Sequence, residues 1–227
     1  MIPRPENPLV AALDVSDVDR AEALAAALEG RVGLFKVGLE LFSAHGPASV
    51  LRLRHYGPVF LDLKLHDIPN TVERAARNCA RMGVTMLTVH TLGGPAMVAA
   101  AVQGAARGAE ESGHGMPLVA AVTVLSSLGG ESLASPASLA FEAMSAGAPA
   151  AVVSGGDVAV VREVVGEAFC LVVPGIRPAG SNGHDQLRIL TPEEAIEAGA
   201  DYLVIGRPIT ESEDPGGTAG AILSTIR

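Results

Sequence analysis

The chain has 227 residues, a length that suits one large domain better than two. Hydrophobic residues make up 48% of it and charged residues 18%, a balance that excludes disordered and fibrous proteins. The formal net charge of −9 argues against nucleic acid or an anionic membrane as a partner, because neither gains from a negative surface.

Predicted strands recur along the chain as short apolar runs rich in β-branched residues, and stretches of helical character follow them. The runs are Leu9–Leu13, Val32–Val37, Val59–Leu63, Val84–Val89, Leu118–Val124, Ala150–Val153, Cys170–Val173 and Tyr202–Ile205. Ala-rich amphipathic patterns over Asp17–Leu28 and Thr71–Met82 predict two of the helices. Alternating strands and helices imply parallel pairing, and about eight units fit a single-domain α/β fold, a (β/α)₈ barrel over residues 1–227.

An open doubly wound sheet is the alternative fold. Such sheets usually carry a glycine-rich dinucleotide loop after the first strand, whereas Leu13-Asp14-Val15 has no glycine near it. Polar residues instead fall at or just past the ends of the predicted strands, where a barrel builds its active site. They are Asp14, Lys36, Asp62, Lys64, His90, Ser126, Ser154, Arg177 and Arg207.

Cysteine usage and the N-terminus bear on the compartment. Cys79 and Cys170 lie in apolar surroundings without metal-ligand spacing, which predicts two buried thiols in a reducing environment. The N-terminal residues lack a basic stretch followed by a long apolar run, and no segment reaches the roughly 18 apolar residues of a spanning helix. We therefore expect a cytoplasmic protein with no membrane or nucleic-acid partner.

The third predicted strand carries the charged motif of the chain. Because strand side chains alternate, Asp62 and Lys64 should share one face, opposite Leu61, Leu63 and Leu65. Asp67 follows in the turn, and Thr71 is a candidate N-cap, with Pro69 fixing the approach to the next helix. The run could be an internal salt bridge, but buried charges of this kind cluster at functional sites.

The segment Asp62-Leu-Lys-Leu-His-Asp-Ile-Pro-Asn-Thr71 resembles the signature of the orotidine 5′-monophosphate decarboxylases almost letter for letter. Further segments resemble that family in order along essentially the whole chain. They are Ala12-Leu-Asp14, Phe35-Lys36-Val-Gly38, Thr88-Val-His90, Val122-Thr-Val-Leu-Ser126, Pro174-Gly-Ile-Arg177 and Val204-Ile-Gly206-Arg207-Pro-Ile-Thr210. The resemblance implies a phosphate-binding barrel that decarboxylates orotidine monophosphate to uridine monophosphate in pyrimidine biosynthesis.

By resemblance, Lys64 stabilises the carbanion at C6 of the pyrimidine and then protonates it. Asp62 would lie beside the departing carboxylate and act either by repelling it or by positioning Lys64. Lys36 would join a Lys36–Asp62–Lys64–Asp67 array and reach the ribose, and Asp14 would bind a ribose hydroxyl. In the resembling enzymes the last Asp and Thr of the signature reach the neighbouring subunit's site, which implies a homodimer.

The remaining binding residues also follow from the resemblance. Ile68 and Thr71 belong to the signature, and Ser126 would bind the pyrimidine where the family more often has Thr. Gly206 and Arg207 stand where barrels bind phosphate. Arg177 and Gln186 lie on the loop Pro174–Gln186, which could close over the ligand, although Arg177 could equally be a solvated charge. His184 replaces an acidic residue of many relatives, and His66 and His90 are expected to pack rather than react.

We expect no metal and no organic cofactor, because Lys64 between carboxylates would repel a cation. Two alternatives remain. One is a Mg²⁺-dependent sugar-phosphate enzyme of the same superfamily, which shares the Asp-x-Lys-x-x-Asp core. The other is a non-catalytic barrel that only binds a phosphate compound.

Overall fold

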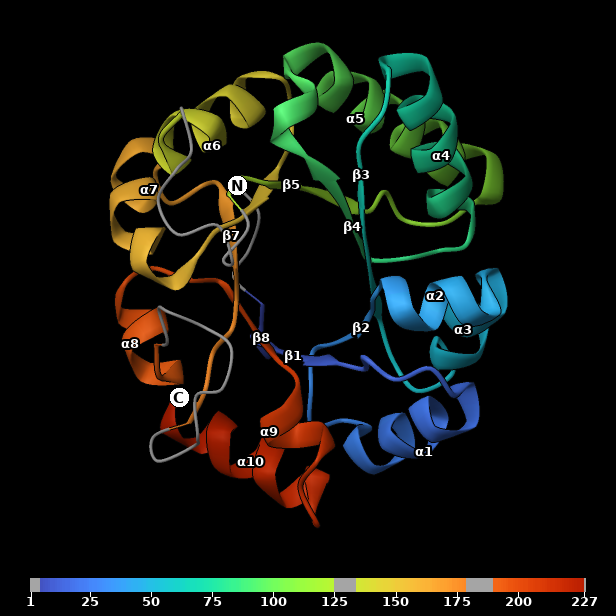
Figure 1. The fold of residues 1–227 in the computed structure, drawn as a ribbon, viewed down its shortest axis with the longest axis vertical. Helices are drawn as coiled ribbons and strands as arrows, with labels where there is room; N and C mark the ends of the chain where they lie inside the picture. Colours follow the sequence, from blue (N-terminus) through green and yellow to red (C-terminus); the bar gives the residue numbers. More distant parts are fainter. Residues whose placement is uncertain (1–4, 125–133, 179–189, 227) are drawn as a thin grey trace.

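The protein is a closed barrel of eight parallel strands, each hydrogen-bonded to the next in chain order and the last to the first (Figure 1). A computed structural model describes residues 5–124, 134–178 and 190–226. The strands are β1 (Leu9–Ala12), β2 (Leu34–Val37), β3 (Val59–Leu65), β4 (Met86–His90), β5 (Leu118–Val122), β6 (Ala150–Val152), β7 (Cys170–Pro174) and β8 (Tyr202–Ile205). The predicted fold is confirmed, and each strand begins and ends within two residues of its predicted bounds.

Helices surround the barrel as an outer ring (Figure 1). In the described part of the chain they are α1 (Val18–Leu28), α2 (Leu39–His45), α3 (Pro47–Leu53), α4 (Pro69–Arg81), α5 (Pro95–Ser112), α6 (Pro136–Ser145), α7 (Val158–Val165), α8 (Pro192–Glu197), α9 (Arg207–Thr210) and α10 (Pro215–Thr225). Short 3₁₀ turns at Thr91–Gly93 and Gly155–Asp157 follow β4 and β6. No described helix is long and apolar enough to cross a membrane.

The two helices with predicted bounds begin differently from each other. The side chain of Asp17 accepts hydrogen bonds from the first turn of α1, as an N-cap does. The prediction that Thr71 caps α4 is wrong, because α4 begins at Pro69 and Ile68 is its N-cap. Proline is well suited to the first helical position, since its fixed φ matches the helix and its missing N–H is not needed there.

The strands bury side chains on both faces. Outward-facing residues pack with the helices in one large cluster, and a second cluster fills the barrel interior. Leu34, Phe60 and Met86 belong to the interior cluster. Two residues further along the same three strands, the inward positions become polar: Lys36, Asp62 and Thr88. The interior is therefore apolar in its depth and charged toward the carboxyl ends of the strands.

Candidate active site

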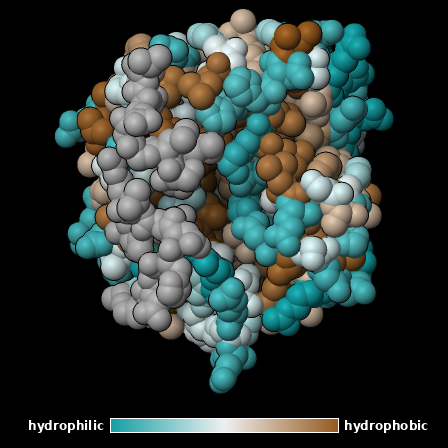
Figure 2. All heavy atoms as spheres, viewed as in Figure 1, coloured by the Kyte–Doolittle hydropathy of each residue, from teal (hydrophilic) through white to brown (hydrophobic). Residues whose placement is uncertain are grey.

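A cavity of about 780 Å³ lies at the carboxyl ends of the strands, a size that suits a small-molecule ligand. Figure 2 shows a hollow near the middle of one face of the molecule, with hydrophilic side chains beside it. Seven of the predicted site residues line the cavity: Asp14, Lys36, Asp62, Lys64, Arg177, Gly206 and Arg207. The barrel thus brings together predicted site residues from β2 and β3 and from the segments after β1, β7 and β8.

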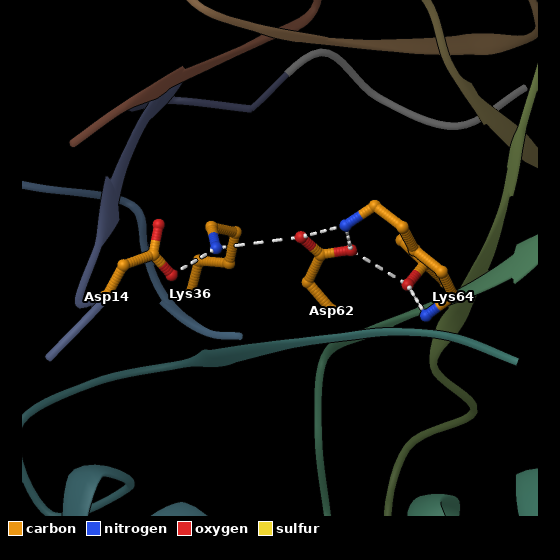
Figure 3. A network of polar contacts seen from close by, with 5 residues as sticks. Asp14, Lys36, Asp62 and Lys64 are labelled. Carbon is orange, nitrogen blue, oxygen red and sulfur yellow. Dashed lines mark hydrogen bonds and ion pairs between the residues drawn. The ribbon is translucent and has the colours of Figure 1, made fainter. Parts of the chain in front are cut away.

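Four of these side chains form a chain of alternating charges (Figure 3). Lys36 Nζ lies 2.7 Å from Asp14 Oδ1 and 3.5 Å from Asp62 Oδ2. Lys64 Nζ donates to both carboxylate oxygens of Asp62 at 2.8 Å. Asp62 therefore lies between two ammonium groups, which keeps the charges paired inside the barrel mouth.

Burial and the neighbouring ammonium groups shift the pKa of Asp62 in opposite directions. Burial alone would raise the pKa of this carboxyl, since only 9% of the residue is exposed. Lys36 and Lys64 outweigh burial, and hydrogen bonds from Lys64 and Thr88 add to their effect, so the pKa of Asp62 falls below its usual value. The site therefore holds a carboxylate anion next to the Lys64 ammonium at neutral pH.

Sequence reasoning missed Thr88 as a site residue. Its fully buried hydroxyl contacts Asp62 Oδ1 at 3.0 Å and accepts the backbone N–H of Lys64 at 2.8 Å. The available signal was its position, two residues after the inward-facing Met86. Arg20 and Glu211 also line the cavity, and no motif in the sequence marked them; Thr210, the last residue of the segment Val204–Thr210 that resembles the family, lines it too but was assigned no role.

Arg177 and Arg207 extend the cavity beyond β7 and β8. Arg177 is 8% exposed, so the alternative of a solvated loop charge is wrong. Arg207 is the first residue of α9, immediately after Gly206. Cationic groups thus line both the strand ends of the cavity and this outer part, which suits an anionic ligand.

The other predicted residues lie elsewhere. Asp67, Ile68 and Thr71 are exposed and do not line the cavity. Asp67 Oδ1 accepts the backbone N–H of Ile68 at 2.6 Å. The array within one chain therefore runs from Asp14 to Lys64. Ser126, His184 and Gln186 lie outside the described residues.

The two histidines near the array pack against each other, with ring centroids 5.5 Å apart. His90 Nδ1 accepts the backbone N–H of Leu92 at 3.3 Å. Burial, with smaller effects of His66 and Lys64, lowers the pKa of His90. These rings take part in packing and in a turn, as expected.

The cysteines match the expectation of buried thiols. Cys79 and Cys170 are both free and buried. Burial raises the pKa of Cys79 to about 11 and is the main cause that raises the pKa of Cys170 to about 12. Among the described residues, no three His, Cys, Asp or Glu side chains are grouped so that they could hold a metal ion.

Comparison with known proteins gives a consistent result. The model of the orotidine 5′-phosphate decarboxylase / HUMPS family matches residues 7–222. The chain is 49% identical to an orotidine 5′-phosphate decarboxylase of Anaeromyxobacter sp. (strain K), over 98% of this chain and all of that protein. It is 48% identical to one of Paramagnetospirillum magneticum, over 97% and 98% of the two chains.

A solved structure agrees in fold. The crystal structure of orotidine 5′-phosphate decarboxylase from Lactobacillus acidophilus superposes with a TM-score of 0.85 at 34% identity, covering 98% of this chain and all of that one. The family resemblance therefore extends from the sequence motifs to the whole barrel. The chain belongs to the orotidine 5′-phosphate decarboxylase / HUMPS family.

Proposed function

We infer that the protein converts orotidine 5′-monophosphate to uridine 5′-monophosphate, a step of pyrimidine biosynthesis. The observation that carries this function is the buried Lys36–Asp62–Lys64 array, which faces the cavity in a chain of this family. The C6–carboxylate bond breaks, CO₂ leaves, and the electron pair stays on C6. Lys64 then gives its proton to C6 and regains one from solvent. The reaction written in this way needs neither a metal nor an organic cofactor.

The array supports this chemistry through electrostatics. The carbanion at C6 lies in the plane of the ring, where no ring carbonyl can accept its charge as an enolate. A fixed ammonium next to C6 stabilises that charge electrostatically. The side chain of Lys64 is 33% exposed and is held by both oxygens of Asp62, so its ammonium is oriented and still accessible to a ligand.

Asp62 has two proposed effects, which differ in where they act. Its carboxylate would repel the substrate carboxylate that lies beside it, or it would mainly hold Lys64 in place. The 2.8 Å contacts from the Lys64 ammonium to both oxygens of Asp62 favour positioning, because they fix the orientation of the proton donor.

The rest of the cavity suits the nucleotide. Asp14 and Lys36 would bind the ribose hydroxyls, and Arg207 with the Gly206 backbone would bind the phosphate, assisted by Arg177. Gln186 and Ser126 would complete the phosphate and pyrimidine contacts. Binding energy from the phosphate is then available to favour the transition state at the distant C6.

We further propose that the protein is a homodimer with shared sites. Asp67, Ile68 and Thr71 would contribute to the neighbouring subunit's cavity rather than to their own. Their exposure and their position outside the cavity lining of their own chain support this, and Ile68 leaves 65% of an apolar side chain exposed. Asp67 would thereby become the last member of the charged array.

The decisive experiment adds orotidine monophosphate to the protein in excess EDTA and follows the loss of orotate-type ultraviolet absorbance. Rapid loss with uridine monophosphate as product is expected. Activity only on a sugar phosphate and only after Mg²⁺ is restored would move the protein to the other branch of its family. Binding of phosphate compounds without turnover under either condition would indicate a non-catalytic barrel.

Two variants test the assigned roles. Lys64→Ala should lower kcat at least about 100-fold, the scale of losing a main electrostatic donor, and Arg107→Ala removes a cation from a remote, exposed ion pair as a control. Mixing Lys64→Ala and Asp67→Ala subunits tests the shared site. Half of randomly formed dimers are hybrids with one intact site in two, so about a quarter of wild-type activity should return. No recovery would refute the shared site.

A further inference from the structure

The strand that carries the proton donor is irregular at the site. Leu61 pairs with Leu87 of β4 and Leu65 pairs with Val89, so three residues of β3 stand opposite the single residue Thr88. On its other side, Thr88 keeps the regular parallel register with Ala120 of β5. The irregularity is thus confined to residues 62–64, the segment that holds Asp62 and Lys64.

Lys64 has an unfavourable backbone conformation within this irregular segment. Its φ of 50° lies in the left-handed region, and it is the one non-glycine residue of the described chain with positive φ. Such a conformation is unfavourable for a residue with a Cβ atom, because the Cβ comes too close to the following carbonyl oxygen. Glycine would avoid the cost but has no ammonium group, so the surrounding structure must hold lysine in this conformation.

The hydroxyl of Thr88 is placed to do so. It accepts the backbone N–H of Lys64 at 2.8 Å, the group that a regular ladder would have paired with a carbonyl of β4. Its own hydrogen must point to Asp62 Oδ1, 3.0 Å away, because an ionised carboxylate only accepts. One buried hydroxyl therefore fixes both the backbone that presents the ammonium and the carboxylate that orients it.

We propose that Thr88 is a positioning residue of the decarboxylase, which holds Lys64 in its left-handed conformation and Asp62 in line so that the ammonium faces C6. The inference rests on the proposed function. Thr88 is fully buried and does not line the cavity, so it acts through Lys64 and Asp62 and does not touch the substrate. Its loss should therefore slow the chemical step more than it weakens binding.

The test compares Thr88→Val with Thr88→Ser. Valine keeps the shape and removes both hydrogen bonds, so we expect kcat to fall about 10- to 100-fold, as for a misplaced reacting group. The KM and the inhibition constant of uridine monophosphate should change less than about threefold, since the ribose and phosphate contacts remain. Serine keeps the hydroxyl and should keep kcat within about threefold of the wild-type value.

Ser49→Ala is the matched control. Ser49 is fully buried, its hydroxyl donates to the Gly46 carbonyl at 2.6 Å, and it does not line the cavity. It should lose stability, measured by urea unfolding, without losing kcat. If Thr88→Val does not fold, the kcat of Thr88→Ala compared with that of Thr88→Ser tests the same role.

Three results would overturn the role of Thr88: a Thr88→Val enzyme with wild-type kcat, a Thr88→Ser enzyme as slow as the valine or alanine variant, or an equal loss of kcat in Ser49→Ala. The proposed function fails separately, because it is tested by the turnover of the wild-type protein in the same assay. The role of Thr88 is tested only by the ratio of each variant's kcat to the kcat of that wild type.

Discussion

Replacing Asp201 with alanine is expected to destabilise the barrel strongly while leaving kcat unchanged. Asp201 directly precedes β8 and is 8% exposed. Its Oδ2 accepts from Arg162 Nη2 at 2.6 Å. The same guanidinium, which comes from α7, donates to the carbonyls of Gly166, Phe169 and Gly199. These contacts link the segments that directly precede β7 and β8. Both segments lie at the barrel end opposite the cavity, where side chains serve stability.

The magnitude follows from what the substitution leaves behind. Without the carboxylate, the buried guanidinium of Arg162 has lost its anionic partner, a change that costs about 3–5 kcal/mol in buried pairs. The backbone N–H of Leu171 loses its 2.8 Å acceptor as well, which adds about 1–3 kcal/mol. The three carbonyls still hold the guanidinium and offset part of this cost. We therefore expect a net loss of about 3–5 kcal/mol, or roughly 6–20 °C in Tm for a chain of this size.

Urea and thermal unfolding measure the stability, and kcat is taken at a temperature where both proteins are folded. Asp201→Asn keeps an acceptor oxygen and should cost less than the alanine variant. Glu111→Ala removes a carboxylate from an exposed pair with Arg77 and should cost at most about 1 kcal/mol. A Tm within about 2 °C of wild type for Asp201→Ala would refute the argument from burial. A tenfold fall in kcat would refute the argument that side chains at the barrel end opposite the cavity contribute to stability and not to the reaction.

Three further predictions concern packing, pH and substrate binding. Gly104→Ala should destabilise the protein in urea unfolding despite alanine's higher helix propensity, because a Cβ atom there would lie 2.1 Å from the Glu73 carbonyl of α4; Gly115→Ala, with open space around it, should show no such loss. Burial lowers the pKa of His90 from 6.5. Below pH 6.5 the unfolded chain therefore binds a proton at His90 that the folded chain does not bind. Stability should fall by at most about 1.4 kcal/mol per pH unit from pH 6.5 down to the folded pKa, and His90→Asn should flatten that fall; an unchanged slope would contradict the assignment. Arg207→Ala should lower kcat/KM at least about 100-fold in the absorbance assay if this side chain binds the phosphate, and a change below threefold would exclude that role.

The barrel could be predicted from the sequence because its strands are buried on both faces. Such strands appear as nearly continuous apolar runs, and all eight runs became strands. The site was predictable for a related reason: charged residues such as Lys36 and Asp62 interrupt these runs only near their ends, where the barrel opens. Closure of the barrel then brings the predicted site residues from five separate segments to one cavity.

Helix bounds were less predictable, since they depend on local competition between caps. Thr71 has the side chain of an N-cap, but Pro69 starts α4 two residues earlier because its φ is already helical. The exposure of Asp67 was a further limit, because it follows from tertiary packing that the sequence pattern does not express.

Thr88 shows most directly why the sequence did not predict every residue of the site. Alternation along β3 correctly separated Leu61 from Asp62 and Lys64, yet it assumed a regular strand. The extra residues of β3 are defined only by its register against β4, a tertiary property, and the left-handed Lys64 contradicts local backbone preference. A lysine where glycine is favoured is tolerated only if the neighbouring strand holds it, and a position that breaks a local rule in this way is where function is expected. The local rule failed at the residue to which the chemistry is assigned, and its neighbour across the irregular pairing supplies the hydroxyl that keeps it there.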